Sequence, residues 1–94
     1  MKTELEKDIE GPSVVYAISR GWVEIKIMSA NKNGWPDRFF FRAQGAHTRV
    51  VCIEFKKVGK APTRQQFKRH GELRAQNVEV YWTDSFEEAK QWLY

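Results

Sequence analysis

The stretch that decides the fold is PDRFFFRAQGAHTRVVCIEFKK, residues 36–57. Residues 38–43 and 49–56 are rich in aromatic and β-branched side chains, and the segment 44–47 between them contains glycine, so the stretch predicts a β-hairpin. The second strand is apolar almost without interruption until Glu54, which is typical of a central, buried strand. The hairpin therefore predicts two neighbouring strands, with Asp37 just before the first and Glu54 near the end of the second.

On the N-terminal side of the hairpin, the pattern predicts a helix and one more strand. Thr3 and Glu6 form a capping-box signal for a helix that continues to about Arg20. Gly11-Pro12 falls inside it, where we expect a kink or a restart because proline lacks the backbone N–H. Residues 22–28 alternate between apolar and polar side chains, as in a strand, and residues 29–36 form a polar loop.

On the C-terminal side, Thr63 and Gln66 form a second capping box, which predicts a helix from residue 63 to about 76. Residues 78–83 predict a fourth strand, and Ser85 is the expected N-cap of a last helix. The full order is helix, three strands, helix, strand, helix. This order predicts an α/β domain with a mixed sheet flanked by helices, and the absence of repeats or linkers predicts a single domain over residues 1–94.

The composition is that of a small folded domain. The chain has 94 residues, of which 41% are hydrophobic and 30% charged. No apolar run approaches the ~20 residues that a membrane span requires, and the N-terminus lacks the apolar stretch of a signal peptide. The single cysteine, Cys52, suits a reducing compartment and is expected to be an inert core thiol. We therefore expect a cytoplasmic protein, in a bacterial or phage-infected host cell, with no membrane partner.

The net charge of +4 modestly favours a polyanionic partner. Basic residues gather directly after the hairpin, where they suit contacts to phosphate groups. A solvated helix face is the alternative explanation for each of them. Lys26, on the strand before the hairpin, is a candidate either for a phosphate contact or for an ion pair. The candidate DNA-binding residues are Lys26, Lys57, Lys60, Arg64 and Lys68.

Asp37, Glu54 and Lys56 are the residues with the clearest chemical potential. Glu54 and Lys56 stand two apart in a strand, so their side chains project from the same face. Mg²⁺ prefers oxygen ligands and commonly takes one or two carboxylates from a protein. As a text pattern the motif is weak, because an aspartate after proline is commonly a turn residue and a Glu-x-Lys at a strand end is commonly a solvated pair.

The element order, with Asp37 at the start of one strand and Glu54-x-Lys56 at the end of the next, resembles the PD-(D/E)xK nuclease fold. The longer pattern is similar to stand-alone virus-type replication-repair nucleases, the VRR-NUC family, over nearly the whole chain. The segments that carry this resemblance are EKDIE (6–10), the RGW…IK stretch (20–26), NGWPDR (33–38), VCIEFKK (51–57), TRQQ (63–66) and NVEVYWTDSFEEA (77–89). The resemblance implies a restriction-endonuclease-like α-β-β-β-α-β-α core.

The resemblance also implies a metal site. Asp37, Glu54 and the backbone carbonyl of Phe55 are the expected ligands of Mg²⁺ or Mn²⁺. Lys56 is expected to position the attacking water or to stabilise the negative charge that develops in the transition state. Glu10 is the expected third carboxylate from the first helix.

Two assignments within this site have alternatives. Glu6 is the fallback for Glu10, although it is better explained as the capping partner of Thr3. Gln66 is expected near the attacking water, with helix capping as its competing role. Asn77 stands where the family commonly has glycine, which asparagine can replace because it also adopts left-handed backbone conformations.

The function that follows is a Mg²⁺- or Mn²⁺-dependent DNA endonuclease. Stand-alone members of the family are associated with homodimers that act on branched DNA such as four-way junctions. A dimer is also expected because 14% of the residues are aromatic, more than one small core is expected to bury. The alternatives are a non-catalytic DNA-binding or assembly module with the same fold, and a flap or restriction-type nuclease with the same chemistry. His47 and His70 have no partner at zinc-ligand spacing, so no zinc site is expected.

Overall fold

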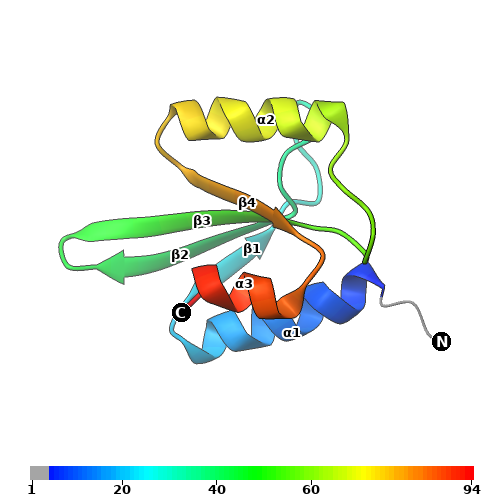
Figure 1. The fold of residues 1–94 in the computed structure, drawn as a ribbon. Helices are drawn as coiled ribbons and strands as arrows, with labels where there is room; N and C mark the ends of the chain where they lie inside the picture. Colours follow the sequence, from blue (N-terminus) through cyan, green and yellow to red (C-terminus); the bar gives the residue numbers. More distant parts are fainter. Residues whose placement is uncertain (1–4) are drawn as a thin grey trace.

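The computed structural model describes residues 5–94 and contains seven elements in the expected order (Figure 1). Their arrangement confirms the predicted sequence of helix, three strands, helix, strand and helix. The elements are α1 (Glu6–Ser19), β1 (Val23–Lys26), β2 (Arg38–Gln44), β3 (His47–Phe55), α2 (Arg64–Ala75), β4 (Glu79–Thr83) and α3 (Phe86–Trp92).

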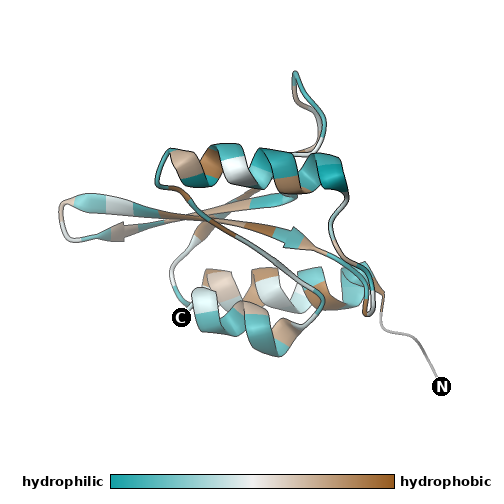
Figure 2. Cartoon of the chain, turned by 45° about the horizontal axis from the view of Figure 1, so that its top comes forward, coloured by the Kyte–Doolittle hydropathy of each residue, from teal (hydrophilic) through white to brown (hydrophobic). Residues whose placement is uncertain are grey.

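The four strands form one mixed sheet in the order β1-β2-β3-β4. β1, β2 and β3 are antiparallel neighbours, whereas β4 runs parallel to β3. A parallel pair requires a crossover, and α2 provides it. Figures 1 and 2 show α2 on one face of the sheet and α1 with α3 on the other. The mixed sheet flanked by helices is therefore confirmed, with β3 in a central position.

The hydrophobic core lies between the sheet and the pair α1 and α3. Side chains of β2 and β3 pack there against the apolar side of both helices, and Trp22 donates its indole N–H to the carbonyl of Leu93 at 3.0 Å. This bond ties the start of β1 to the C-terminal end of the chain. The buried members of the core are Ile9, Ala17, Trp22, Phe40, Val51, Ile53, Phe55, Ala89 and Leu93.

The opposite face of the sheet is only partly covered. α2 packs against β4, while β1 is left largely open on that side. Val23 pairs with Phe41 and Glu24 with the core residue Phe40, so the apolar side chains of β1 point away from the core. Val23 is 66% exposed and Ile25 46%. The apolar surface that α2 leaves uncovered is therefore aliphatic at the β1 edge.

This distribution corrects one part of the expectation about a dimer. Among the aromatic residues in the described part of the chain, only Phe67 and Tyr94 are largely exposed. The core and the stacking of side chains such as Tyr81 on Trp92 cover most of the other aromatic surface. An exposed aromatic patch is therefore the wrong basis for a dimer, because the exposed apolar groups are mostly aliphatic.

α1 runs without a break through Gly11 and Pro12, so the predicted restart of the helix is wrong. Pro12 removes the hydrogen bond to the carbonyl of Asp8, but both residues are exposed, so water can satisfy that carbonyl. Ile9 and Ser13, on the buried side, belong to the same continuous helix on either side of Pro12. The Thr3 cap lies outside the described residues. Within them, the Asp8 carboxylate accepts the N–H of Leu5 at 3.1 Å.

β1 is shorter than predicted, because it ends at Lys26 and not at residue 28. Its partner β2 begins only at Arg38, and Pro36 before it cannot donate a ladder hydrogen bond. Ile27 still donates its N–H to the carbonyl of Asp37 at 2.8 Å, after which the chain leaves the sheet. Asn77 has φ 64°, which confirms the left-handed conformation expected there. Within residues 5–94, no helix is long and apolar enough to cross a membrane.

Candidate active site

The sheet register brings Asp37 and Glu54 together. Arg38 pairs with Ile53, so the residues one step outward, Asp37 and Glu54, stand opposite each other at the same end of the sheet. Figure 1 shows β2 beginning and β3 ending at this end. The backbone N–H of Phe55 donates to Oδ2 of Asp37 at 3.1 Å, which fixes the aspartate against β3. Thus an antiparallel pairing aligns two carboxyl groups that are 17 residues apart in the sequence.

The two carboxyl groups strongly perturb each other's protonation. Burial, followed by the charge of Glu54, raises the pKa of Asp37 to about 7. Burial also raises the pKa of Glu54 to about 6, although a hydrogen bond to Asp37 acts in the opposite direction. Only 1% of Glu54 is exposed. Two carboxyl groups held together in this way share a proton near neutral pH, or else repel each other.

This pair fits a divalent cation. Two neighbouring carboxylates offer hard oxygen donors and the negative charge that Mg²⁺ or Mn²⁺ requires, and a magnesium site commonly uses only one or two protein carboxylates. The backbone carbonyl of Phe55 belongs to the strand position between Glu54 and Lys56. Within residues 5–94, no third histidine, cysteine or carboxylate joins the pair to make a complete ligand cluster.

Lys56 lies beside the pair, as predicted. Its backbone N–H donates to the carbonyl of Thr83 at 2.9 Å, which extends the β3–β4 pairing past the last residue of β3. The side chain shares the face of Glu54, and its positive charge helps to lower the pKa of that carboxyl group. The structure therefore gathers Asp37, Glu54 and Lys56 at one end of the sheet.

Glu10 reaches the neighbourhood of the pair but is engaged elsewhere. Its carboxylate accepts from Nε of Arg38 at 2.8 Å and lies 3.8 Å from Nζ of Lys26. Arg38 also forms an ion pair with Glu24. This network explains why a glutamate can be almost fully buried. Lys26 thus has the ion pair that was the alternative to a phosphate contact.

Glu6 also faces this end of the sheet. Burial raises its pKa, and the next largest cause is the charge of Asp37. Glu10 makes a smaller contribution to the raised pKa of Asp37. Both glutamates of α1 are therefore close enough to affect the pair electrostatically, while neither contacts it. The choice between them as a third carboxylate stays a prediction.

Gln66 closes the capping box of α2. Its Oε1 accepts the N–H of Thr63 at 2.8 Å, and Oγ1 of Thr63 accepts the N–H of Gln66 at 3.2 Å. The capping role is thus present in the structure, and it occupies the side-chain oxygen. A role near the attacking water is left to the amide nitrogen and stays a prediction.

The basic residues lie on the surface near the start of α2. Lys57, Lys60, Arg64 and Lys68 are all exposed, and no carboxylate of residues 5–94 lies within 4 Å of their charged groups. A hollow of about 570 Å³ is lined by Thr63, Arg64, Gln65 and Lys68. Unpaired cations around a hollow are available for phosphate groups.

The loop before Asp37 is anchored to α2, although no sequence pattern indicates this contact. Arg69 donates from Nε to the carbonyl of Asn33 at 3.0 Å, and its guanidinium lies 5.4 Å from the ring centre of Trp35. Gly34 has φ 95°, and a Cβ there would lie 2.9 Å from the carbonyl oxygen of Gln65. Glycine thus allows the loop to approach α2 closely just before Asp37.

His70 also lies next to the carboxyl pair, and no sequence pattern predicts this. It lies on α2, is fully buried, and places Nε2 3.5 Å from Oε1 of Glu54. Nothing in the sequence distinguishes it from a histidine on a solvated helix face, because α2 is mostly polar (Figure 2). Only the packing of α2 on the sheet reveals the contact.

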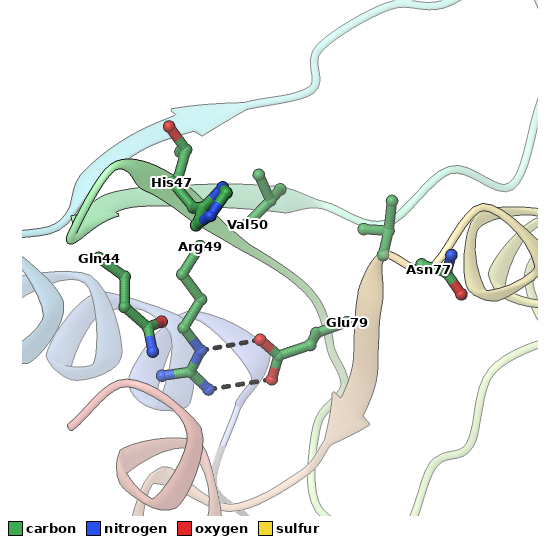
Figure 3. A pocket seen from close by; sticks show the side chains of 8 residues that line it. Gln44, His47, Arg49, Val50, Asn77 and Glu79 are labelled. Atoms are coloured by element: carbon green, nitrogen blue, oxygen red, sulfur yellow. Dashed lines mark hydrogen bonds and ion pairs between the residues drawn. The ribbon is translucent and has the colours of Figure 1, made fainter.

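A pocket of about 310 Å³ lies at the other end of β3 (Figure 3). It is lined by residues of the hairpin and of the start of β4, including Gln44, His47, Val50 and Asn77. Its carboxylate, Glu79, is bound by Nε and Nη2 of Arg49 at 2.8 and 2.9 Å. This ion pair lowers the pKa of Glu79. The pocket therefore has no second carboxylate and lacks the features of the Asp37–Glu54 pair.

No protein-family model matches the sequence, and neither does any curated protein. One solved structure, described as a "VRR_NUC domain", is similar with a TM-score of 0.79 and 18% sequence identity, covering 92% of this chain and 90% of that chain. At this identity the likeness concerns the fold, and activity must be argued from the site. The fold expected from the resemblance is thus confirmed: the chain has the fold of a VRR_NUC domain.

Proposed function

We propose that the chain is a Mg²⁺- or Mn²⁺-dependent endonuclease that hydrolyses phosphodiester bonds in DNA. The observation that carries this proposal is the pairing of Asp37 with Glu54, with Lys56 on the same strand face. Buried, mutually repelling carboxyl groups destabilise the folded protein, and groups perturbed in this way cluster at functional sites. A nuclease fold with this pair at the end of the sheet is well explained by metal-assisted hydrolysis.

Each residue of the site has a role in this proposal. Asp37 and Glu54, with the carbonyl of Phe55, hold the cation, which lowers the pKa of a water molecule and offsets charge on the phosphate when bound. Lys56 holds the attacking water or stabilises the charge that builds up on the phosphate oxygens. The exposed cations Lys57 and Lys60 contact the DNA backbone, together with Arg64 and Lys68 on α2.

The substrate and assembly are parts of the same proposal. We propose a homodimer that acts on branched DNA such as four-way junctions, since two sites related by two-fold symmetry match the paired strands of a junction. The aliphatic surface at the β1 edge, where Val23 and Ile25 are exposed, supports an interface between copies. No base-reading element is evident within residues 5–94, so recognition by DNA shape is favoured.

The test is a cleavage assay with four DNA substrates of matched sequence: linear, flap, splayed and four-way. Each is incubated with Mg²⁺, Mn²⁺ or EDTA. We expect metal-dependent cleavage that EDTA abolishes and that is fastest on the four-way junction. Cleavage in EDTA would contradict the metal role, while binding without cleavage under every condition would favour the non-catalytic module.

A pair of neighbouring lysines provides a matched control. Lys56→Ala removes the charge on the face of Glu54, whereas Lys57→Ala removes an exposed charge one position later. We expect Lys56→Ala to lose cleavage and Lys57→Ala to keep it, with at most weaker DNA binding. Cleavage by Lys56→Ala at the wild-type rate would remove Lys56 from the mechanism.

A further inference from the structure

His70 and Glu54 are two buried side chains that each carry polar atoms without a hydrogen-bond partner. His70 is 0% exposed and Glu54 1%. Neither ring nitrogen of His70 has a partner in the structure, and neither does Oε1 of Glu54. The two unpartnered groups face each other, with Nε2 of His70 3.5 Å from Oε1 of Glu54.

Burial makes this arrangement costly unless the two groups interact. A buried polar group without a hydrogen-bond partner destabilises the folded state. Here one group is a ring nitrogen that can carry a proton, and the other is a carboxylate oxygen that accepts one. A shift of a few tenths of an ångström brings the pair to ordinary hydrogen-bond length. The bond satisfies an atom on each residue at once.

The ring of His70 can offer an N–H to Glu54 in either protonation state, because a neutral imidazole carries one N–H and a protonated one carries two. The ring edge is also packed by Phe67, whose centre lies 6.0 Å away with the planes at 76°. A neutral imidazole has one donor, and Nε2 is the nitrogen that faces Glu54.

We propose that His70 is a positioning residue of the metal site, donating Nε2–H to Oε1 of Glu54 and thereby holding that carboxylate in the orientation that binds the cation. This inference rests on the proposed function. Glu54 is then fixed from two sides, by His70 of α2 through one oxygen and by its neighbour Asp37 on the sheet. Hydrogen bonds behind a carboxylate ligand orient it, and their loss commonly lowers metal affinity 10–100-fold.

This role links α2 to the site for a physical reason. β3 places Glu54 on the sheet face that α2 covers, so a flexible glutamate there needs a fixed partner on the helix. A glutamate has more rotatable bonds than an aspartate and loses more entropy when it is held. A histidine that is packed on all sides supplies a rigid donor.

The experiment measures binding of Mn²⁺ alone by calorimetry, without DNA, for the full chain and four variants. His70→Gln keeps an amide N–H at about the reach of Nε2, while His70→Asn is a shorter amide that falls short of Glu54. His70→Leu removes the donor. Leu73→Ala trims a half-buried side chain of the same helix and is the control for general destabilisation.

We expect His70→Leu and His70→Asn to bind Mn²⁺ at least tenfold more weakly than wild type, and His70→Gln and Leu73→Ala to stay within about threefold of it. If His70→Leu fails to fold, the comparison of His70→Gln with His70→Asn decides alone. Equal Mn²⁺ affinity of those two amide variants, with wild-type binding intact, would overturn the role of His70 while leaving the proposed function standing. Absence of Mn²⁺ binding by wild type would overturn both.

Discussion

Asp37→Asn should stabilise the metal-free protein at neutral pH, although it removes a residue of the proposed metal site. The carboxylate of Asp37 is partly buried beside Glu54, and these two causes raise its pKa from 3.8 to about 7. An asparagine has no charge to desolvate or to repel Glu54. Its side-chain oxygen can still accept the N–H of Phe55, and its amide can donate to Glu54.

The size of the effect follows from the pKa. A carboxyl group whose pKa is raised from 3.8 to about 7 costs the folded state about 4 kcal/mol once it is ionised. The group is only partly buried and its charge is screened, so we expect about 2 kcal/mol. In a domain of this size, 2 kcal/mol corresponds to roughly 10 °C in Tm.

The direction of the Asp37 pKa shift predicts how the stability of the protein depends on pH. Because the folded pKa lies above the unfolded one, the folded state of wild type binds more protons between about pH 4 and pH 7. Wild-type stability therefore falls as the pH rises through this window. The advantage of Asp37→Asn should be fully present at pH 8 and should disappear below pH 4.

The assay is thermal unfolding in EDTA at a series of pH values. Asp84→Asn is the matched control, because Asp84 also accepts a backbone N–H at 3.1 Å, from Gly59, but replacing it leaves the Asp37–Glu54 pair intact. A melting temperature of Asp37→Asn at or below that of wild type at pH 8, or an equal advantage of this variant at pH 4 and pH 8, would refute the expected effect of the Asp37 charge. Addition of Mn²⁺ should reverse the order, because only wild type gains from binding.

Four further outcomes are expected. Glu54→Gln should bind Mn²⁺ at least tenfold more weakly and lose cleavage while remaining folded, and undiminished Mn²⁺ binding in calorimetry would contradict its place in the site. Lys56→Ala should reduce the rate of DNA cleavage in the presence of Mg²⁺ by about 10²-fold or more while binding Mn²⁺ normally, since the charge of Lys56 acts on the transition state. Gly34→Ala should lower the stability measured by thermal unfolding by about 2 kcal/mol more than Gly45→Ala. Both glycines have positive φ, but only at Gly34 does a backbone atom lie within 3 Å of the added Cβ. Equal losses of stability would show that the contact with α2 is not the cause. Light scattering should give twice the 11.1 kDa of one chain, and Ile25→Lys should give a monomer; a wild-type monomer at micromolar concentration would refute the dimer.

The sequence by itself determined the order of elements, because that order follows from local physics. Thr63 caps α2 and Ser85 caps α3 as their side chains predicted. The apolar run of β3 became the central strand, and the glycine-containing turn set the hairpin register. That register is sufficient to place Asp37 opposite Glu54, so the pair at the centre of the proposed site was predictable.

Other features were decided only by the tertiary structure. Pro12 predicts a break by its chemistry, yet the buried side of α1 keeps the helix whole. Val23 and Ile25 have the alternation of core residues, yet α2 does not extend over β1, so they are exposed. Whether this apolar strand face is covered depends on where a helix packs that begins 38 residues after the end of β1, and no local pattern records that.

The partners of the charged residues are likewise a tertiary property. In the sequence, Glu10 cannot be distinguished from a solvent-exposed glutamate of a helix. Only the β1–β2 pairing places Arg38 and Lys26 against it. Nothing in the sequence of the polar helix α2 indicates that His70 is buried. The packing of α2 on the sheet places it next to Glu54. Burial and charge pairing act through space between distant residues, so the sequence alone determined the strands that bear the carboxylates, and only the packed fold decided what surrounds them.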